Sequence, residues 1–456
     1  MRAAALSVWI FINLLCFGMC GYLYLIWSKY WMYLEKQRLF NPTVTLDGAD
    51  LVLPESYNPT KLSRGSVLNS TEGRKSRRAA IGTYWSSSKL DETAKSAAHP
   101  PSHVEMRSRG GPRFPNVDHP VLQFDSDKYQ CSDYTTDECA EKTEAFKRAL
   151  LKEFHRVLMA DSNVFKSGLD VHNTYNVQWS GGGGGGVRER AGGELRCALR
   201  RVAVRTVAAA DEPFRSRGFR IPPVPPRRYR TCAVVTSAGA LLGSQLGKFI
   251  DSHDMVLRFN NAPVENYTDD VGSKTTFRIL NSQVVTKPEY RFPDDPLFHN
   301  VSMLIWDPAN YSSTLEEWFE HPDFPLFPVY KRLLEDRKDA DVHLLRPEVL
   351  WQLWAVLQDA SPYRLRRNPP SSGFIGLWFA LQQCARVRMF EYVPSARATR
   401  RCHYHGAAAD AACTLGAWHP LAMEKAVAER MRDNSDVEVF QTGYIDVPGV
   451  GAEPCA

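Results

Sequence analysis

One stretch of this chain decides its fold: residues 232–263 read CAVVTSAGALLGSQLGKFIDSHDMVLRFNNAP. Residues 232–236 form a short apolar run, residues 241–250 carry apolar side chains at helical spacing, and residues 255–259 are apolar again. The order strand, helix, strand is typical of the βαβ unit of a parallel sheet. This stretch therefore predicts a parallel sheet with helices packed against it.

The residues that follow continue this alternation towards the C-terminus. Apolar runs predict further strands, and apolar residues at helical spacing predict further helices. The strands are expected at 277–280, 302–305, 342–345 and 388–392, and the helices at 347–357, 373–384 and 420–432. Strands that alternate with helices predict a doubly wound α/β domain.

The N-terminal part of the chain has a different composition. No residue between Arg2 and Lys29 is charged, and such a run is long enough to cross a bilayer as a helix. A cleaved signal peptide is the alternative, although its apolar core usually spans only about 7–15 residues. Residues 59–113 are rich in Ser, Pro, Gly, Lys and Arg, and residues 181–186 are all glycine, which favours an extended stem.

We therefore divide the chain into four parts. A short cytoplasmic tail at residues 1–4 precedes a transmembrane signal-anchor at 5–28, a lumenal and largely disordered stem at 29–195, and a folded domain at 196–456. Within the stem, an amphipathic helix is predicted at residues 143–159. The net charge of +5 is small for 456 residues and indicates neither a nucleic acid nor an acidic substrate.

Cysteines and glycosylation sequons agree with a domain of the secretory pathway. Two of the ten cysteines, Cys16 and Cys20, fall inside the apolar span, and the remaining eight predict disulfides in an oxidising lumen. The sequence alone leaves their pairing open. Four sequons for N-linked glycosylation begin at Asn69, Asn266, Asn300 and Asn310.

Small and polar residues follow the predicted strands, at the edge where ligands bind in open α/β sheets. The first strand runs into residues 236–239, Thr-Ser-Ala-Gly, a turn whose backbone N–H groups are suited to a phosphate. Plain packing of the βαβ unit is the alternative interpretation of this turn. Asn260 ends the second strand, and Asn281 and Gln283 follow the third in the same way.

A serine-rich turn and a Cys/His-rich segment lie further along the chain. Residues 371–373, Ser-Ser-Gly, open a strongly apolar helix; capping is the simple interpretation, and anion binding is the further hypothesis. Residues 402–413 contain two cysteines and two histidines, which predict either a zinc site or, as an oxidising lumen favours, a disulfide loop. His419 precedes Pro420 at a helix N-terminus, where the dipole disfavours imidazolium, so a neutral His419 is suited to be a general base.

Taken together, the motifs in the second half of the chain resemble those of the sialyltransferase family, both in their residues and in their order along the chain. Residues 232–260 with residues 281–283 resemble the large sialylmotif, and residues 368–392 resemble the small sialylmotif. Residues 402–405 resemble motif III, and His419 with Glu424 resembles the very small motif. The wording is most similar to the β-galactoside α-2,6 branch of the family.

The resemblance implies an α/β fold, the Rossmann-like single-sheet variant of the A-type glycosyltransferase fold. It also implies a single-pass type II protein of the Golgi membrane, with a lumenal catalytic domain at residues 196–456. The implied reaction transfers sialic acid from CMP-sialic acid to O6 of a terminal galactose on a glycoprotein or oligosaccharide. Inversion of the anomeric centre is implied, with no metal ion and no other cofactor.

The residues that match the family's motifs are expected to carry its roles. His419 would accept the proton of the 6-hydroxyl group, and Gln283 and Asp323 would contact galactose. CMP-sialic acid would be bound by Ser237, Asn260, Asn281, Ser371, Ser372, Gly373, His403, Thr414, Trp418 and Lys425. Disulfides would join Cys197 to Cys455, Cys232 to Cys384 and Cys402 to Cys413, which leaves Cys131 and Cys139 over.

Two departures from the family pattern and two acidic pairs motivate alternatives. Trp418 stands where these enzymes usually have tyrosine, and the residues after Gly443 differ from the family's pattern. A catalytically weak or silent glycan-binding membrane protein is therefore one alternative. A metal-dependent glycosyltransferase is another, since Asp-x-Asp pairs occur at Asp125/Asp127 and Asp339/Asp341. We interpret both pairs as solvated, because the first lies in the predicted stem and the second in a charged, helix-like run.

Overall fold

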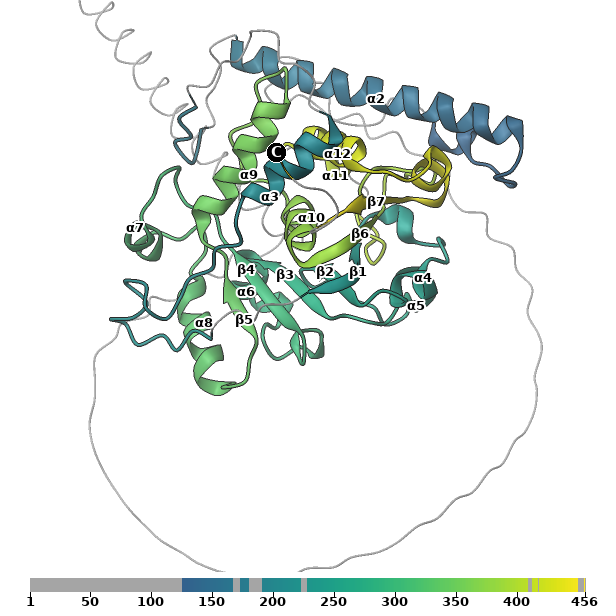
Figure 1. Cartoon of the computed structure of the whole chain (residues 1–456). Helices are drawn as coiled ribbons and strands as arrows, with labels where there is room; N and C mark the ends of the chain where they lie inside the picture. Colours follow the sequence, from purple (N-terminus) through teal and green to yellow (C-terminus); the bar gives the residue numbers. More distant parts are fainter. Residues whose placement is uncertain are drawn as a thin grey trace, which may run out of the picture. The chain divides into compact units, whose positions relative to one another are not determined.

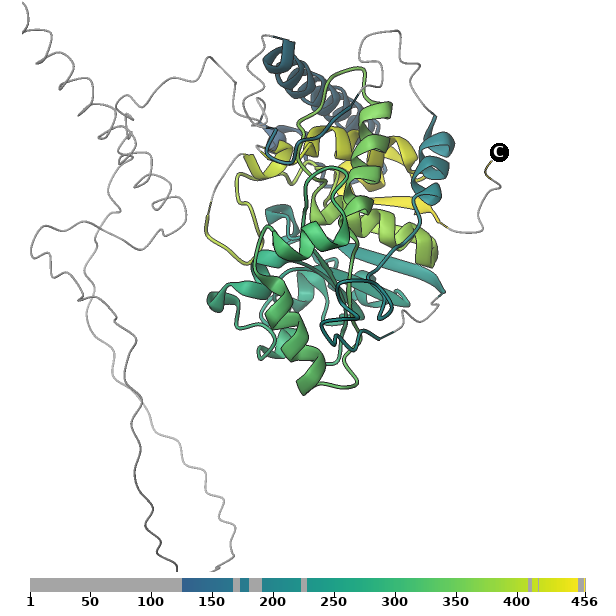
Figure 2. The same cartoon turned by 90° about the vertical axis from the view of Figure 1, so that its left-hand side faces the viewer.

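The computed structural model describes residues 125–166, 173–179, 191–222, 228–408, 412–416, 418–449 and 455 (Figures 1 and 2). Every described residue belongs to one compact unit, Glu105–Ala456. The predicted signal-anchor at 5–28 and the sequon at Asn69 lie outside the described residues. Within the described part, no helix is long and apolar enough to cross a membrane.

A single seven-stranded sheet forms the centre of this unit, with the strand order β5-β4-β3-β2-β1-β6-β7. Every neighbouring pair from β5 to β6 is parallel, whereas β7 runs antiparallel to β6. The strands are β1 (Tyr229–Val235), β2 (Met255–Phe259), β3 (Phe277–Asn281), β4 (Ser302–Trp306), β5 (Val342–Leu344), β6 (Cys384–Phe390) and β7 (Tyr444–Pro448). The predicted α/β class and its single sheet are confirmed.

Helices cover both faces of the sheet, because alternate residues of each strand point to opposite sides. Cys232 and Val234 of β1 belong to the large apolar cluster that includes the helices drawn above the sheet in Figure 1. Ala233 and Val235 face the opposite layer, with Ile250. The helices are α2 (Asp137–Lys166), α3 (Gly192–Arg201), α4 (Gly247–Asp251), α5 (Thr268–Val271), α6 (Ser282–Thr286), α7 (Leu315–Glu320), α8 (Leu326–Asp336), α9 (Pro347–Ala360), α10 (Ser372–Gln383), α11 (Ala412–Leu415) and α12 (Leu421–Met431).

The helix predicted at residues 241–250 is much shorter in the structure. The chain forms a 3₁₀ turn at Gly239–Leu241, and only Gly247–Asp251 is α-helical. The cause is non-local: the Asp270 carboxylate accepts hydrogen bonds from the backbone N–H groups of Gly243 and Gln245, at 2.7 and 3.0 Å. Both residues have a positive φ, which interrupts a helix.

Strand β6 begins earlier than predicted, and β7 was not predicted. The predicted helix at 373–384 ends at Gln383, and Cys384 already starts β6. Strand β7 is short and ends in proline, so its sequence carries little strand signal. Its place beside β6 is held by Arg388 Nε, which donates to Asp446 Oδ2 at 2.8 Å.

The folded part of the chain begins well before residue 196, the predicted start of the folded domain. Helix α2 contains the amphipathic stretch predicted at 143–159, but it extends over Asp137–Lys166. Its residues Phe146, Leu150 and Phe154 are buried in the same apolar cluster as the core of the sheet. An apolar face packed in this way belongs to the domain, and an extended tether offers no such packing.

Four disulfides occur in the described part of the chain. Three of them are the pairs implied by the family resemblance, Cys197–Cys455, Cys232–Cys384 and Cys402–Cys413. The two cysteines left over, Cys131 and Cys139, form the fourth, which links the segment before α2 to the first turn of that helix. Although the residues after Gly443 differ from the family's pattern, Cys455 still forms a disulfide with Cys197 of α3.

Candidate active site

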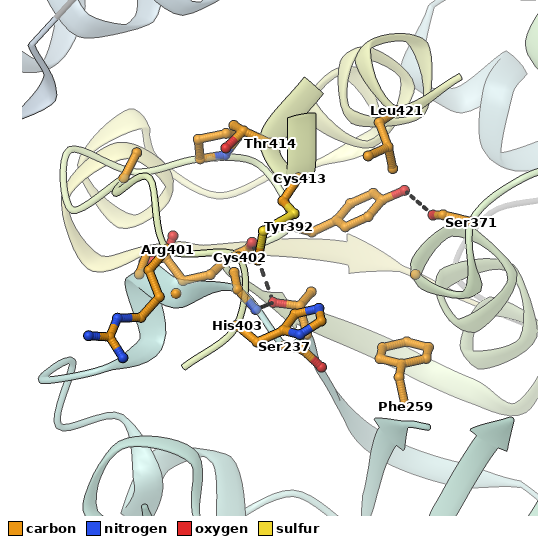
Figure 3. Close-up of a pocket in the computed structure, with 18 of the residues that line it drawn as sticks. Ser237, Phe259, Ser371, Tyr392, Arg401, Cys402, His403, Cys413, Thr414 and Leu421 are labelled. Carbon is orange, nitrogen blue, oxygen red and sulfur yellow. Dashed lines mark hydrogen bonds between the residues drawn. A yellow bond between two sulfur atoms is a disulfide. The ribbon is translucent and has the colours of Figure 1, made fainter. Parts of the chain in front are cut away.

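A cavity of about 300 Å³ lies at the carboxyl edge of β1 and β2, next to the N-terminus of α10 (Figure 3). Turns, α11 and α12 complete its wall. Of the ten residues expected to bind the donor, eight line this cavity: Ser237, Asn260, Ser371, Ser372, Gly373, His403, Thr414 and Lys425. Segments almost 190 residues apart in sequence, from Ser237 to Lys425, therefore meet at one edge of the sheet.

The N-terminus of α10 is capped and pressed against a tyrosine. The Ser371 hydroxyl accepts a hydrogen bond from the Phe374 N–H at 3.2 Å, which satisfies one donor of the first turn. Ser372 Oγ accepts from Trp306 Nε1 at 3.0 Å. A Cβ at Gly373 would lie 2.7 Å from the Tyr392 ring, so only glycine fits there. The remaining backbone donors of this turn are available to an anion.

A buried carboxylate connects this turn to α12. Glu424 is fully buried, and its Oε1 accepts from the Ser371 N–H at 2.8 Å. Its Oε2 accepts from the Ser371 hydroxyl at 2.6 Å and from the Tyr392 hydroxyl at 2.7 Å. The Ser371 and Tyr392 hydroxyls face each other across this site in Figure 3. Glu424 therefore positions the start of α10. The sequence identified this residue as part of the very small motif but gave it no role.

Lys425 brings a positive charge to the cavity. Its ammonium group is buried, donates to the Tyr392 carbonyl oxygen and lies 4.6 Å from the centre of the Tyr392 ring. Burial lowers the pKa of Lys425 to about 8, while the nearby Glu424 and Glu391 carboxylates oppose the shift. The side chain is therefore still mainly protonated at neutral pH, and it suits a phosphate.

The Cys/His-rich segment forms one wall of the cavity. The Tyr404 N–H donates to the Ser237 carbonyl oxygen at 3.1 Å, and the Tyr404 hydroxyl donates to the Pro263 carbonyl oxygen at 2.5 Å. These bonds dock motif III against the turns after β1 and β2. Because Cys402 and Cys413 are joined in a disulfide, their sulfur atoms are not zinc ligands, and the zinc hypothesis for this segment is wrong.

Buried arginine Arg278 holds the turn that carries Asn260. Its guanidinium donates to the carbonyl oxygens of Asn260 and Ala262, at 2.7 and 3.2 Å. Asn260 adopts a left-handed φ of 48°, which asparagine tolerates better than most residues. Its Oδ1 accepts from the Asn281 N–H at 3.0 Å. Asn281 itself does not line the cavity, since its side chain caps α6 by accepting from the Val284 N–H.

His419 is held in one orientation at the start of α12. Its Nδ1 lies 2.7 Å from the Pro369 carbonyl oxygen, so the proton of a neutral ring belongs on Nδ1 and Nε2 is an acceptor. Burial lowers the pKa of His419, which keeps the ring neutral, although Glu424 opposes the shift. The ring lies 4.5 Å from that of Trp418, a residue that is 43% exposed. A neutral, oriented imidazole of this kind is suited to accept a proton.

A second cavity, of about 560 Å³, contains Asp323 and extends beside Tyr175. The ring of Tyr175 lies 6.3 Å from that of Trp418, and its hydroxyl lies 3.4 Å from Asp323 Oδ1. Burial raises the pKa of Asp323. The second cavity therefore lies near His419, because Tyr175 in its wall neighbours Trp418, and Trp418 neighbours His419. Gln283, the other candidate galactose contact, lies in the first turn of α6 and lines neither cavity.

Two residues of this region were missed at the sequence level. Tyr175 falls in the predicted stem, in a segment without periodicity, so no local signal marked it. Asp307 follows β4, where a polar residue at the end of a strand was a usable signal. It is fully buried, and its Oδ2 accepts from Trp318 Nε1 at 2.9 Å and from the Asp323 N–H at 3.0 Å. Burial raises the pKa of Asp307 to about 6.

The acidic pairs have local structural contacts. Asp125 accepts a hydrogen bond from the Asp127 N–H at 3.2 Å, and Asp341 Oδ1 lies at hydrogen-bond distance from His343 Nε2, 2.8 Å. Across the residues that the structure describes, no group of three or more His, Cys, Asp or Glu side chains is placed to hold a metal ion.

Residues 203–435, half of the chain, match the model of glycosyltransferase family 29 (sialyltransferase). The chain therefore belongs to the sialyltransferase family of glycosyltransferases. Its motifs, the cavity at the carboxyl edge of the sheet, and the disulfides Cys232–Cys384 and Cys402–Cys413 all lie within the matched residues.

Curated relatives carry a more specific name. The chain is 46% identical over 291 residues to a Bos taurus protein named β-galactoside α-2,6-sialyltransferase 2, covering 62% of this chain and 58% of the relative. It is 44% identical over 270 residues to the Homo sapiens protein of that name, covering 58% of this chain and 51% of the relative. The chain thus matches between about half and three fifths of the length of these relatives.

A solved structure is also similar in sequence. It is described as a mammalian sialyltransferase in complex with Gal-β-1-3GalNAc-ortho-nitrophenol, and it is 27% identical. The similarity covers 44% of this chain and 65% of that chain, with a TM-score of 0.30. The family assignment rests on the sequence match and not on this superposition.

Proposed function

We propose that this chain transfers sialic acid from CMP-sialic acid to O6 of a terminal galactose on glycoprotein or oligosaccharide acceptors. The observation that carries the proposal is the convergence of eight candidate donor residues on one cavity, with His419 held neutral beside it. The printed name of the relatives supports the α-2,6 linkage and the galactoside acceptor.

The donor end of the site fits a nucleoside monophosphate. The first turn of α10 presents backbone N–H groups with the positive end of the helix dipole, and Lys425 adds a cation. Because CMP carries one phosphate, its departure develops less charge than that of a nucleoside diphosphate. Such preorganised donors can stabilise the leaving group, and we propose that no metal ion is needed.

The proposed reaction is a single displacement. Nε2 of His419 accepts the proton of the galactose 6-hydroxyl, and O6 forms a bond to the anomeric carbon of sialic acid. The bond between that carbon and the phosphate oxygen of CMP breaks, and the phosphate keeps the electron pair. Attack opposite to the leaving group inverts the anomeric centre. Asp323 and Gln283 would contact the galactose, and Trp418, whose ring lies beside that of His419, would contact the donor.

We further propose the Rossmann-like, single-sheet variant of the A-type glycosyltransferase fold for this domain. The parallel sheet with helices on both faces, and the cavity at its carboxyl edge, support that assignment. A Golgi location, with the domain in the lumen and the chain anchored through residues 5–28, is part of the same proposal. The four disulfides support an oxidising compartment.

The test is transfer from labelled CMP-sialic acid to N-acetyllactosamine by the purified protein, with and without excess EDTA. We expect product in both conditions, and the product should be cleaved by a sialidase that accepts the α-2,6 linkage but not by an α-2,3-specific sialidase. His419→Asn should lower turnover by about 10²–10⁴-fold while CMP binding is retained. CMP binding without any transfer by the wild-type protein would favour the silent glycan-binding alternative. Loss of transfer in EDTA would favour a metal-dependent enzyme.

A further inference from the structure

One glycosylation sequon of this chain lies in the wall of the second cavity. Asn310 lines that cavity together with Asp323, and its side chain is exposed. The turn that carries it is fixed at both ends. The Tyr311 N–H donates to the Tyr175 carbonyl oxygen at 2.7 Å, and the Ser313 N–H donates to the Asn310 carbonyl oxygen at 3.0 Å. A group attached to Asn310 would therefore start from a fixed point at the cavity.

The local structure is compatible with N-linked glycosylation. Asn310, Tyr311 and Ser312 form the sequon, on a surface turn of the kind that bears such glycans. In the described part of the chain, no hydrogen bond involves the Asn310 side-chain amide, so a glycan would displace no hydrogen bond. The sequons at Asn266 and Asn300 are also exposed, but neither residue lines either of the two cavities. Asn310 is therefore distinguished by its position.

We propose that an N-linked glycan on Asn310 forms part of the entrance to the acceptor cavity and discriminates against galactose presented on a folded protein. The proposal rests on the proposed function, in which Asp323 contacts the acceptor galactose. It adds a specificity determinant that the chain carries as a covalent modification, since no side chain in the cavity wall has comparable bulk.

The physical basis is steric. An N-glycan is bulky and hydrated, so it does not fill a cavity of about 560 Å³ but covers the space in front of it. A free oligosaccharide can pass this glycan with its galactose end first, because the rest of the oligosaccharide is small. A galactose on a glycoprotein brings the protein surface with it, and two hydrated bodies then compete for the same space. Glycan loss should therefore favour the large acceptor over the small one.

The experiment uses the secreted or full-length protein from a glycosylating host. Asn310→Gln and Ser312→Ala both destroy this sequon, but only the first changes the asparagine that lines the cavity. Asn266→Gln and Asn300→Gln remove exposed sequons elsewhere and serve as matched controls. Glycopeptide mass spectrometry measures occupancy at Asn310. Values of kcat/KM are measured for N-acetyllactosamine and for a desialylated glycoprotein with galactose termini.

We expect glycan at Asn310 and a rise of about fivefold in the ratio of glycoprotein to disaccharide kcat/KM, equally in Asn310→Gln and Ser312→Ala; this corresponds to about 1 kcal/mol. The two controls should leave the ratio at the wild-type value. An unmodified Asn310, or an unchanged ratio despite full occupancy, would overturn the inference. A change in Asn310→Gln alone would also overturn it, because the side chain would then be responsible. Absence of transfer to both acceptors would instead refute the proposed function.

Discussion

The Ser371 hydroxyl lies 2.6 Å from Glu424 Oε2, so the residue that caps α10 and the first turn of α12 share one buried hydrogen bond. The two residues are 53 positions apart in sequence. Ser371 stands at the candidate donor cavity, and His419 stands five residues before Glu424. This contact therefore couples the geometry of the phosphate end to that of the candidate base.

Glu424→Gln should loosen this coupling. Glutamine has the same shape, but its amide group can accept with only one of its two terminal atoms, so at least one buried donor of Ser371 or Tyr392 loses its partner. We expect a loss of stability of about 1–3 kcal/mol and weaker CMP binding, measured by thermal unfolding and calorimetry. Tyr392→Phe removes a single donor and is the matched control, which should cost less. A Glu424→Gln protein with wild-type unfolding temperature and CMP affinity would contradict this account.

CMP affinity should depend on pH through Lys425. The pKa of about 8 means that the ammonium group loses its proton as pH rises through 8, and a bound phosphate favours the protonated form. Affinity should thus be highest below pH 8 and fall above it. Calorimetry between about pH 7 and about pH 9.5 avoids the phosphate's own titration near pH 6. The Lys425→Met protein should bind CMP more weakly, and its affinity should not change over this pH range. If the affinity of that variant falls with pH as it does in the wild-type protein, Lys425 is not the cause.

Truncation should reveal where the domain begins. A secreted protein that starts near residue 120, behind a cleavable signal, should fold and keep its activity, because it retains α2 and Tyr175. A protein that starts at residue 190 loses Phe146, Leu150 and Phe154 from the core, and each large apolar residue removed from a core costs about 3–5 kcal/mol. We expect the shorter protein to be retained in the cell or to aggregate. Equal secretion and activity of the two would mean that α2 is dispensable.

The disulfides should differ in importance. Cys232–Cys384 links β1 to β6 and closes a loop of 152 residues, for which the chain-entropy model gives about 4–5 kcal/mol. Cys402–Cys413 closes only 11 residues beside His403 and Thr414. Cys232→Ser should therefore be retained as misfolded protein, whereas Cys402→Ser should be secreted but bind CMP poorly. Secretion assays and calorimetry check both. Efficient secretion of Cys232→Ser would contradict the ranking.

The part of the fold that depends on local periodicity can be predicted from the amino-acid sequence. The apolar runs of β1 to β5, the apolar helix α10 and the proline-led α12 are visible in short windows, because strand and helix repeat every few residues. The order of these elements also placed the carboxyl edge, and with it the turns of Ser237, Asn260 and Ser371. Ser237 and Asn260 both reach that edge, because parallel strands end on the same side.

The remaining features of the fold and of the site could not be predicted, because they depend on contacts between residues far apart in sequence. Asp270 breaks the helix expected at 241–250, and β7 becomes a strand beside β6 through partners such as Arg388. Helix α2 and Tyr175 join the domain by burial against residues more than 140 positions away. Asn310 becomes part of a cavity wall only when Asp323 and Tyr175 are folded beside it. A local pattern carries no record of such partners, since burial and pairing are properties of the folded chain.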